Sequence, residues 1–367
     1  MDGLSAAAGR RARDLGIVVG RLAPGPYGAI TDVPGVRVGH TTLREPPLVH
    51  SGVTAIVPGD VHPGAPLPAG VFAGNGYGKL IGSTQLAELG TLETPVLLTS
   101  TLSAFRAADT LVGWMLERPA CAGVTSLNPV VGECNDGALS DIRARPVRAE
   151  HVRAALDGAA GGPVAQGCVG AGTGVAALGF KAGVGTASRT VRVAGRSARV
   201  GVLVQANFGG TLRVLGRTVT PADVGVPGPA AGPEAGSCMV VAATDAPLDA
   251  RQLTRVARRA VFALARTGAS YGHGSGDYAI AFGVRPGGTA HARRGYRPRA
   301  LARRGGARWG RPPPADAALD PVFEGVMDAV EEAVLDSLLA AVTTTGPHAR
   351  TRHALPADRL AALLGMR

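Results

Sequence analysis

Short runs of almost wholly apolar residues most constrain the fold of this 367-residue chain. The run CMVVAA, 238–243, is apolar at every position and is followed by a proline turn, which is the pattern of a strand that is covered on both faces. Such runs are too short for a long helix and recur along the chain. The runs that predict strands are 53–57, 95–99, 200–206, 238–243 and 277–282.

Two segments have the periodicity of amphipathic helices. In 249–268, apolar residues recur at intervals of three and four, and Asp249 and Gly268 stand where an N-terminal and a C-terminal cap are expected. In 320–342 the same periodicity follows Pro321, which lies in the expected first turn. Because helices and strands are interspersed, we expect an α/β or α+β protein with layered sheets.

Composition excludes several classes of protein. Hydrophobic residues make up 46% of the chain and charged residues 18%, so we expect a globular rather than a disordered protein. No apolar run approaches the about 20 residues of a membrane-spanning helix, and the N-terminal stretch lacks the apolar core of a signal peptide. The cysteines and histidines have no metal-binding spacing, so we expect reduced thiols, no metal site and a cytoplasmic location. The four cysteines are Cys121, Cys134, Cys168 and Cys238.

The net charge of +11 is concentrated in one segment. Residues 291–311 hold eight arginines and no acidic residue, so the rest of the chain carries only +3. Two aromatic residues in this segment could stack on bases, which leaves a nucleic-acid contact open. An Arg-rich insertion loop, 291–313, is the favoured interpretation, because the rest of the chain has no recognisable nucleic-acid module.

Two glycine-rich stretches lack the spacing of nucleotide-binding sites. The stretch GNGYGKL, 74–80, has no four-residue gap between its glycines and has Leu80 where a phosphate loop has Ser or Thr for magnesium. The stretch GAGTGVAALGF, 170–180, is followed by no acidic residue before Asp223, whereas a dinucleotide site needs one about 20 residues further on. We therefore interpret both stretches as turns or places of close backbone approach.

A serine stands where a loop-like stretch enters a strand. The stretch VTPADVGVPGPAAGPEAG, 219–236, is rich in Pro, Gly and Ala and is typical of an exposed loop. Ser237 follows it directly and precedes the apolar run 238–243. A hydroxyl group at this junction raises the possibility of a nucleophile.

Polar side chains also stand at the ends of other apolar runs. In GHGSGD, 272–277, Ser275 and Asp277 lie two residues apart at the start of a strand, so both point to one face. This pair can hold and relay a proton for a nucleophile elsewhere, or it can cap the strand. Asn207 follows the run 200–206, where its amide can donate to a developing oxyanion or simply end the strand.

The stretch PVVGECNDGALSDI, 129–142, gathers acidic and amide side chains after a strand-like apolar pair. Such a cluster suits the binding of a substrate cation, for example an amine, and it is equally consistent with a polar turn. The side chains are Glu133, Asn135, Asp136 and Asp141.

Nine stretches of the chain resemble one peptidase family in the same order. They extend from residue 12 to about residue 338, so the resemblance covers nearly the whole chain and is far more specific than one short motif. The chain is similar to peptidase family S58, which includes the L-aminopeptidase/D-amidase (D-esterase) and the β-peptidyl aminopeptidases. The stretches are ARDLGI, GAITDVPGVRVGHTT, AGNGYGKLIG, GECNDGALSDI, GPVAQGCVGAGTGVAALGFKAGVGTASR, VLVQANFG, GSCMVVAATDAPL, GSGDYAIAF and DPVFEGVMDAVEEAVLDSL.

The resemblance implies one catalytic domain that takes up the whole chain and folds as a four-layer αββα sandwich, like N-terminal-nucleophile hydrolases. Family members are made as one inactive chain that cuts itself immediately before its nucleophile. In this chain the implied bond is Gly236–Ser237, and the products are an α chain, 1–236, and a β chain, 237–367. Glycine before the serine minimises steric hindrance at the attacked carbonyl.

The resemblance also implies a set of site residues. They are a serine nucleophile, a hydroxyl–carboxylate pair that orients it, an amide that stabilises the oxyanion, and a carboxylate that holds the free ammonium group of the substrate. In this order the residues are Ser237, Ser275 with Asp277, Asn207, and Glu133 with Asn135 beside it. Cleavage would expose the α-amino group of the nucleophile, whose pKa is typically about 7.7–8.0, so that it can transfer protons near neutrality.

The implied activity is that of a serine aminopeptidase that acts on short peptides, amides or esters with a free amino terminus. The choice among α-L, β and D residues stays open. The resemblance implies no metal or organic cofactor, and an assembly of αβ units that is often a homotetramer. The chain ends in a tail, 344–367, with a short terminal helix.

Three positions depart from the pattern of the family. Ala138 stands where relatives have a tyrosine that helps to form the oxyanion hole, and losing one such donor typically costs about 10²–10³ in turnover. A water molecule, a backbone amide or Tyr77 could replace it. Cys238 beside Ser237 offers a thiol as an alternative nucleophile, but the register of the following residues favours the serine. The segment 291–311 is the third departure.

Two other functions stay open on the sequence. An ornithine acetyltransferase shares the sandwich and the self-cleavage, but its new N-terminal residue is threonine, whereas this chain has Ser237. A protein associated with nucleic acid through 291–311, with its catalytic apparatus decayed at Ala138, is the alternative of another class.

Overall fold

The structure is a computed structural model that describes residues 10–229, 236–284 and 313–366. The Arg-rich segment 291–313 lies, apart from its last residue, outside the described residues. Both the insertion loop and the nucleic-acid contact therefore stay predictions.

The chain alternates strands and helices throughout. The helices are α1 (Ser83–Leu89), α2 (Ala104–Leu116), α3 (Ala149–Asp157), α4 (Ala250–Arg266), α5 (Asp320–Leu339) and α6 (Ala357–Leu364). The strands of the first half are β1 (Val36–Glu45), β2 (Val49–Pro58), β3 (Leu67–Gly76), β4 (Thr91–Leu92), β5 (Val96–Ser100), β6 (Val130–Cys134), β7 (Ala176–Ala177) and β8 (Phe180–Lys181). The remaining strands are β9 (Val184–Val193), β10 (Arg196–Asn207), β11 (Leu212–Val214), β12 (Arg217–Val219), β13 (Ser237–Thr244), β14 (Gly276–Gly283), β15 (Thr344–Thr345) and β16 (Thr351–Arg352).

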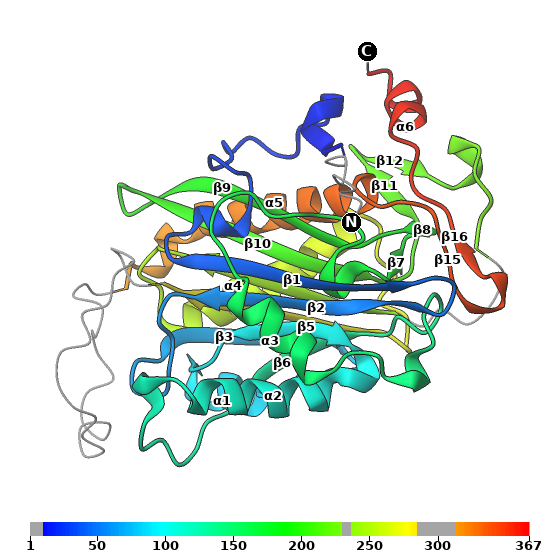
Figure 1. The fold of residues 1–367 in the computed structure, drawn as a ribbon. Coiled ribbons are helices and arrows are strands. Elements are labelled where there is room, and N and C mark those ends of the chain that lie inside the picture. Colours follow the sequence, from blue (N-terminus) through cyan, green and yellow to red (C-terminus); the bar gives the residue numbers. More distant parts are fainter. Residues whose placement is uncertain (1–9, 230–235, 285–312, 367) are drawn as a thin grey trace.

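Two large sheets form the centre of the molecule (Figure 1). One has four strands in the order β1-β2-β5-β6, and the other has six in the order β4-β3-β14-β13-β10-β9. The pairs β5–β6 and β13–β14 are parallel, and the other neighbouring pairs are antiparallel. The remaining described strands form the small two-stranded sheets β7–β8, β11–β12 and β15–β16.

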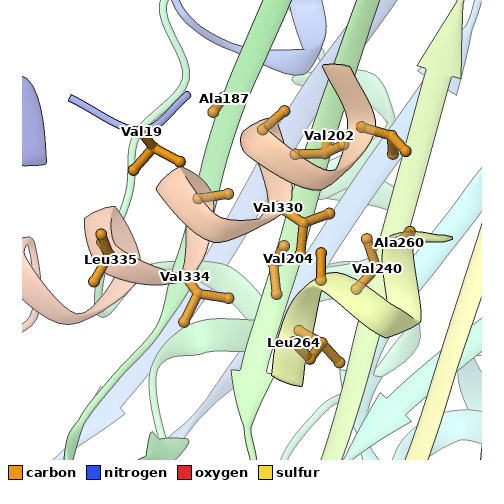
Figure 2. Close-up of a cluster of buried hydrophobic side chains, with 14 of the residues drawn as sticks. Val19, Ala187, Val202, Val204, Val240, Ala260, Leu264, Val330, Val334 and Leu335 are labelled. Atoms are coloured by element: carbon orange, nitrogen blue, oxygen red, sulfur yellow. The ribbon is translucent and has the colours of Figure 1, made fainter. Parts of the chain in front are cut away.

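Three apolar clusters separate four layers. The first packs α4 and α5 against the six-stranded sheet, and Figure 2 shows Leu264 and Val330 over Val240 of β13. The second lies between the two sheets and includes Val241, the next residue of β13. The third packs α2 and α3 against the four-stranded sheet around Leu111. The predicted four-layer αββα sandwich is therefore confirmed, and β13 is apolar throughout because both of its faces are covered.

The predicted elements are present, with the two helices ending two or three residues earlier than predicted and most of the strands extending beyond their apolar runs. All five predicted strands occur, as β2, β5, β10, β13 and β14. Asp249 caps α4 as predicted, since its side chain accepts a hydrogen bond of 2.7 Å from the N–H of Gln252. Gly268 follows the helix with φ +99°, a conformation that favours glycine. Pro321 lies in the first turn of α5.

The glycine-rich stretch 170–180 is a place of close backbone approach, as predicted. A Cβ atom at Gly172 would lie 2.3 Å from the backbone nitrogen of Val184. Gly170 has φ +50°, and a Cβ atom there would lie 2.5 Å from Oγ1 of Thr54. At both positions only glycine fits the space. At Gly170 the backbone conformation also favours glycine.

Candidate active site

Ser237 is the first residue of β13 and lies in the middle of the six-stranded sheet. Its partner on the antiparallel neighbour β10 is Asn207, and its partner on the parallel neighbour β14 is Gly276. Gly276 stands between Ser275 and Asp277. The strand register therefore brings together the four residues that the sequence singled out as catalytic, and Ser237 is only 3% exposed.

The hydroxyl of Ser237 accepts a hydrogen bond from the backbone N–H of Asn135, with 3.2 Å between Oγ and N. The carbonyl of Asn135 in turn accepts a hydrogen bond of 3.1 Å from Nδ2 of Asn207. Oδ1 of Asn207 accepts from the N–H of Ala176, also at 3.1 Å. One of the two N–H groups on Nδ2 suffices for the Asn135 carbonyl, so the second can serve a developing oxyanion.

Ser275 and Asp277 point to one side, as their spacing predicts. Oγ of Ser275 donates a hydrogen bond of 2.8 Å to Oδ1 of Asp277, and both side chains are buried. Oδ2 of Asp277 is buried and has no hydrogen-bond partner among the residues that the structure describes. Burial raises the pKa of Asp277, and the bond from Ser275 opposes that shift. One carboxylate oxygen thus remains available for a donor that arrives later.

Gly236, the residue before the nucleophile, is enclosed on several sides. A Cβ atom there would lie 3.1 Å from Cα of Phe208 and 3.2 Å from both the carbonyl oxygen of Asn207 and Oγ of Ser275. The carbonyl of Gly236 accepts a hydrogen bond of 3.3 Å from the N–H of Gly276. Glycine is thus the residue that fits here with the least strain, and its carbonyl already faces a donor.

Glu133 lies on β6 of the other sheet, where it is buried. Oε1 accepts a hydrogen bond of 2.9 Å from the backbone N–H of Lys79, and Oε2 accepts one from the hydroxyl of Thr101. A Cβ atom at Gly78 would lie 3.3 Å from Oε1 of Glu133 and 3.2 Å from Cα of Gly276. The turn that contains Gly78 therefore lies between Glu133 and β14, so Glu133 is at the same end of the sheets as Ser237.

The other two acids of 129–142 lie apart from the nucleophile. Asp136 accepts hydrogen bonds from the hydroxyls of Ser51 at 2.6 Å and Ser100 at 2.7 Å. Burial raises the pKa of Asp136 to about 6, although both hydroxyls oppose the shift. Asp141 caps the short helix Ile142–Ala144 by accepting from the N–H groups of Arg143 and Ala144. The polar-turn interpretation therefore holds for Asp141.

Sequence reasoning missed the backbone donors of the site. The N–H groups of Asn135, Gly276 and Lys79 bond to Ser237, Gly236 and Glu133 respectively. Every non-proline residue carries such a group, so no sequence signal distinguishes them. Of the replacements considered for the missing tyrosine, a backbone amide does contact the nucleophile, since the N–H of Asn135 bonds to Ser237.

Ala138 is half-buried in the turn after Asn135. Tyr77, by contrast, has a side chain that is 67% exposed, with its ring centroid 6.2 Å from that of His273. The exposed aromatic pair therefore belongs to the surface around the site rather than to its buried centre.

In the described ranges, no group of three or more His, Cys, Asp or Glu side chains is arranged to hold a metal ion. The four cysteines are free and buried. None of the described helices combines the length and the apolar character of a membrane span.

Comparison with known proteins agrees with this geometry. The model of peptidase family S58 matches residues 28–352. The β-peptidyl aminopeptidase BapA of Sphingosinicella microcystinivorans is 39% identical over 388 aligned residues, which cover 99% of this chain and 94% of that protein. A β-aminopeptidase structure from Burkholderia sp. has a TM-score of 0.86 and 39% identity, covering 97% of this chain and 98% of the other.

A second solved structure is the L-aminopeptidase D-Ala-esterase/amidase of Ochrobactrum anthropi, described as a prototype of the serine aminopeptidases and a variant of the N-terminal-nucleophile hydrolase fold. It has a TM-score of 0.81 and 37% identity, and the match covers 97% of this chain and 98% of the other. The chain therefore belongs to peptidase family S58 and is a serine aminopeptidase of the N-terminal-nucleophile hydrolase type.

Proposed function

We propose that the chain cuts itself between Gly236 and Ser237 and that Ser237 is then the nucleophile of the aminopeptidase. The observation that carries the proposal is the position of Ser237 at the start of β13, between Asn207 and Gly276, with the N–H of Asn135 on its hydroxyl. The tight enclosure of Gly236 supports the position of the cut.

The cut proceeds by an N-to-O shift. Oγ of Ser237 attacks the carbonyl carbon of Gly236, the carbon–nitrogen bond breaks, and the nitrogen takes up a proton. The N–H of Gly276, which already bonds to the carbonyl of Gly236, stabilises the negative charge that develops there. Water then hydrolyses the ester, which leaves an α chain that ends in a carboxylate and a β chain that begins with a free amine.

The new α-amino group of Ser237 acts in turnover as the base for its own hydroxyl. Ser275 and the unpaired oxygen of Asp277 supply acceptors for this amine in its protonated form. The second N–H of the Asn207 amide and the N–H of Asn135 donate to the oxyanion of the acyl intermediate. The residues that bind and react are thus held on strand ends rather than on free loops.

Glu133 selects substrates that have a free amino terminus. Its carboxylate is buried, and its described partners are a hydroxyl and a backbone N–H rather than a cation. A substrate ammonium group therefore gains a charged partner there, whereas a peptide that continues beyond this point would leave the carboxylate unpaired. Asn135, beside it, contributes to the same site. We infer an exopeptidase.

The substrates are short peptides, amides or esters, from which the enzyme releases the N-terminal residue. The curated relative is named for β-peptidyl substrates, and the Ochrobactrum anthropi protein for L-aminopeptidase and D-Ala-esterase/amidase activity. Both names support a site that accepts residues other than ordinary α-L-amino acids. The same resemblance supports a homotetramer of αβ units without metal or organic cofactor. The four free cysteines support a reducing, cytoplasmic location.

The intact masses of the purified protein and of a Ser237→Ala variant test the proposal. We expect the wild type to separate into two chains, 1–236 and 237–367, and the variant to stay whole and inactive, because no nucleophile remains. A Cys238→Ala variant is the matched control, since it keeps the serine and removes the neighbouring thiol. A wild-type chain that stays uncut, or a Ser237→Ala variant that still cuts, would contradict the proposal.

A further inference from the structure

The glycine-rich turn 75–79, which the sequence left without a function, touches two parts of the site. The backbone N–H of Lys79 donates a hydrogen bond of 2.9 Å to Oε1 of Glu133. The backbone N–H of Tyr77 donates one of 3.2 Å to the carbonyl of Ser275. One turn of five residues therefore links the carboxylate that faces the substrate amine to the residue beside the nucleophile.

The hydroxyl of Tyr278, on β14, bonds to the backbone of this turn. It lies 2.9 Å from the carbonyl oxygen of Gly76 and 3.2 Å from that of Gly78, and these two acceptors share its single proton. Its ring supports the same turn, because a Cβ atom at Gly78 would lie 2.9 Å from Cε2 of Tyr278. At the first residue, Nδ2 of Asn75 donates a hydrogen bond of 2.7 Å to the carbonyl of Gly272.

Tyr278 remains a hydrogen-bond donor at neutral pH. Burial raises the pKa of its phenol, and the negative charge of Glu133 raises it further. A protonated phenol is the form that can donate to the carbonyls of Gly76 and Gly78. The hydrogen bonds from Tyr278 to the turn are therefore present at neutral pH.

We propose that the turn 75–79, clamped by Tyr278, fixes the distance between the Glu133 carboxylate and Ser237 and thereby sets the choice between α- and β-amino-acid substrates. The inference rests on the proposed function, in which Glu133 binds the substrate amine and Ser237 attacks the carbonyl. Tyr278 is then a positioning residue, because it acts through the turn and touches no reacting atom.

The reason is geometric. In a β-amino acid, one additional carbon atom separates the amine from the attacked carbonyl, and one carbon–carbon bond is about 1.5 Å long. A displacement of the reacting atoms by about 1 Å is enough to change turnover strongly. A turn that holds Glu133 in one place thus favours substrates with one spacing between the amine and the attacked carbonyl. If the turn is loosened or displaced, this preference becomes weaker.

The probes are the p-nitroanilides of L-alanine and β-alanine, which are isomers and differ in this spacing. In Tyr278→Phe, the ring stays and the hydroxyl is lost, so that the carbonyl of exposed Gly76 turns to water and the turn loosens. We expect kcat/KM for the preferred isomer to fall about 3- to 10-fold, the effect of one net hydrogen bond, with the larger part in kcat because the attacked carbonyl is held less well against Ser237. The ratio of kcat/KM between the isomers should shift by a similar factor.

Gly78→Ala is the second variant, because its Cβ atom would press on both Tyr278 and Glu133 while the hydroxyl stays in place. It should change the same ratio, and it carries the test if Tyr278→Phe fails to fold. Tyr27→Phe, in the N-terminal segment, is the matched control and should leave the ratio unchanged. Self-cleavage and thermal unfolding show whether each variant is folded.

The outcomes separate the inference from the proposed function. If the wild type hydrolyses N-acetyl-alanine p-nitroanilide as well as the free amine, Glu133 does not bind the amine and the proposed function is wrong at that point. If the wild type requires the free amine but both turn variants change the two isomers equally, or change neither, the inference is overturned. A changed isomer ratio in either folded variant supports it.

Discussion

Buried carboxylates occur in two regions of this molecule, and their partners differ. On α5, the acids are paired with arginines from other parts of the chain. Glu332 accepts hydrogen bonds from Arg13 at 2.6 Å and from Arg189 at 2.7 Å, and Arg189 is 0% exposed. Asp336 accepts one of 2.8 Å from Arg11. These charges fasten the N-terminal segment and β9 to a helix more than 100 residues away in sequence.

In and around the active site, the partners of the buried carboxylates are hydroxyl and backbone N–H groups. Among the described residues, Asp277 bonds to Ser275, Asp136 to Ser51 and Ser100, and Glu133 to Thr101 and Lys79. The carboxylates bonded to arginines join distant parts of the fold, whereas Glu133 and Asp277, which have no cationic partner among the described residues, are the two to which the proposed function assigns an amine. The lesson is that burial alone does not reveal the role of an acid, but the charge of its partners does.

The largest effect that tests the difference between these two groups of carboxylates is expected at Asp277. In Asp277→Asn we expect kcat to fall by about 10²–10⁴, the usual contribution of a positioned proton-transfer group. In the uncut Ser237→Ala background, where no ammonium group forms at residue 237, the same change should alter the free energy of unfolding by less than about 1 kcal/mol. Turnover of L-alanine p-nitroanilide by fully cleaved protein and urea unfolding measure the two effects. Asp141→Asn is the control, and a kcat within threefold of the wild type would contradict the role of Asp277.

At Arg189 the opposite result is expected. Arg189→Met leaves Glu332 with one partner instead of two and should lower the free energy of unfolding by about 3–5 kcal/mol, as when a buried ion pair is broken. Folded protein should keep its kcat, because this region lies on the helix side of the sheet. Arg21→Met is the matched control: that side chain is 88% exposed in its pair with Glu324, so less than about 1 kcal/mol is expected. If urea unfolding gave equal losses in the free energy of unfolding for both variants, the buried pair would contribute no more to stability than the exposed one.

The pH dependence of the free energy of unfolding tests Asp136, a buried acid whose side-chain partners are hydroxyl groups. Its pKa is raised from 3.8 to about 6 in the folded protein, so the folded state binds more protons than the unfolded state between these values. The stability of the wild type should therefore fall as the pH rises from about 4 to 7, by up to about 3 kcal/mol from this group. In Asp136→Asn this part of the fall should be absent, whereas Asp336, whose pKa is also raised to about 6, affects both proteins alike. Parallel stability curves for the two proteins would show that Asp136 does not titrate in this range.

Much of the catalytic strand arrangement could be predicted from sequence, because apolar runs mark strands that are covered on both faces. Ser237, Asn207 and Asp277 stand at the ends of three such runs, and the structure places them on neighbouring strands. Strand β9 could not be found in this way. It contains Arg189, which is buried against Glu332 of a distant helix, and a pattern that equates burial with apolar residues excludes such a strand.

The finer geometry of the site was also beyond sequence patterns. The donors to Ser237 and Glu133 are backbone groups of Asn135 and Lys79, whose positions depend on how two sheets face each other. The neutral partners of Asp136 come from β2 and the end of β5. Such contacts join residues that are far apart in the chain, and they become visible only when the sheets are assembled.

The order of strands in the six-stranded sheet has a consequence for how the enzyme comes into being. Strands β13 and β14 lie between β10 and β3, so on the proposed cleavage two strands of the β chain are flanked on both sides by strands of the α chain. Neither product contains the complete six-stranded sheet, and two separately made chains would each present unpaired strand edges of it to the solvent. The N–H groups of Asn135 and Gly276 reach Ser237 and the carbonyl of Gly236 only when this interleaving is complete. On the proposed mechanism only folded chains can therefore cut themselves, and chains that have not folded stay inactive.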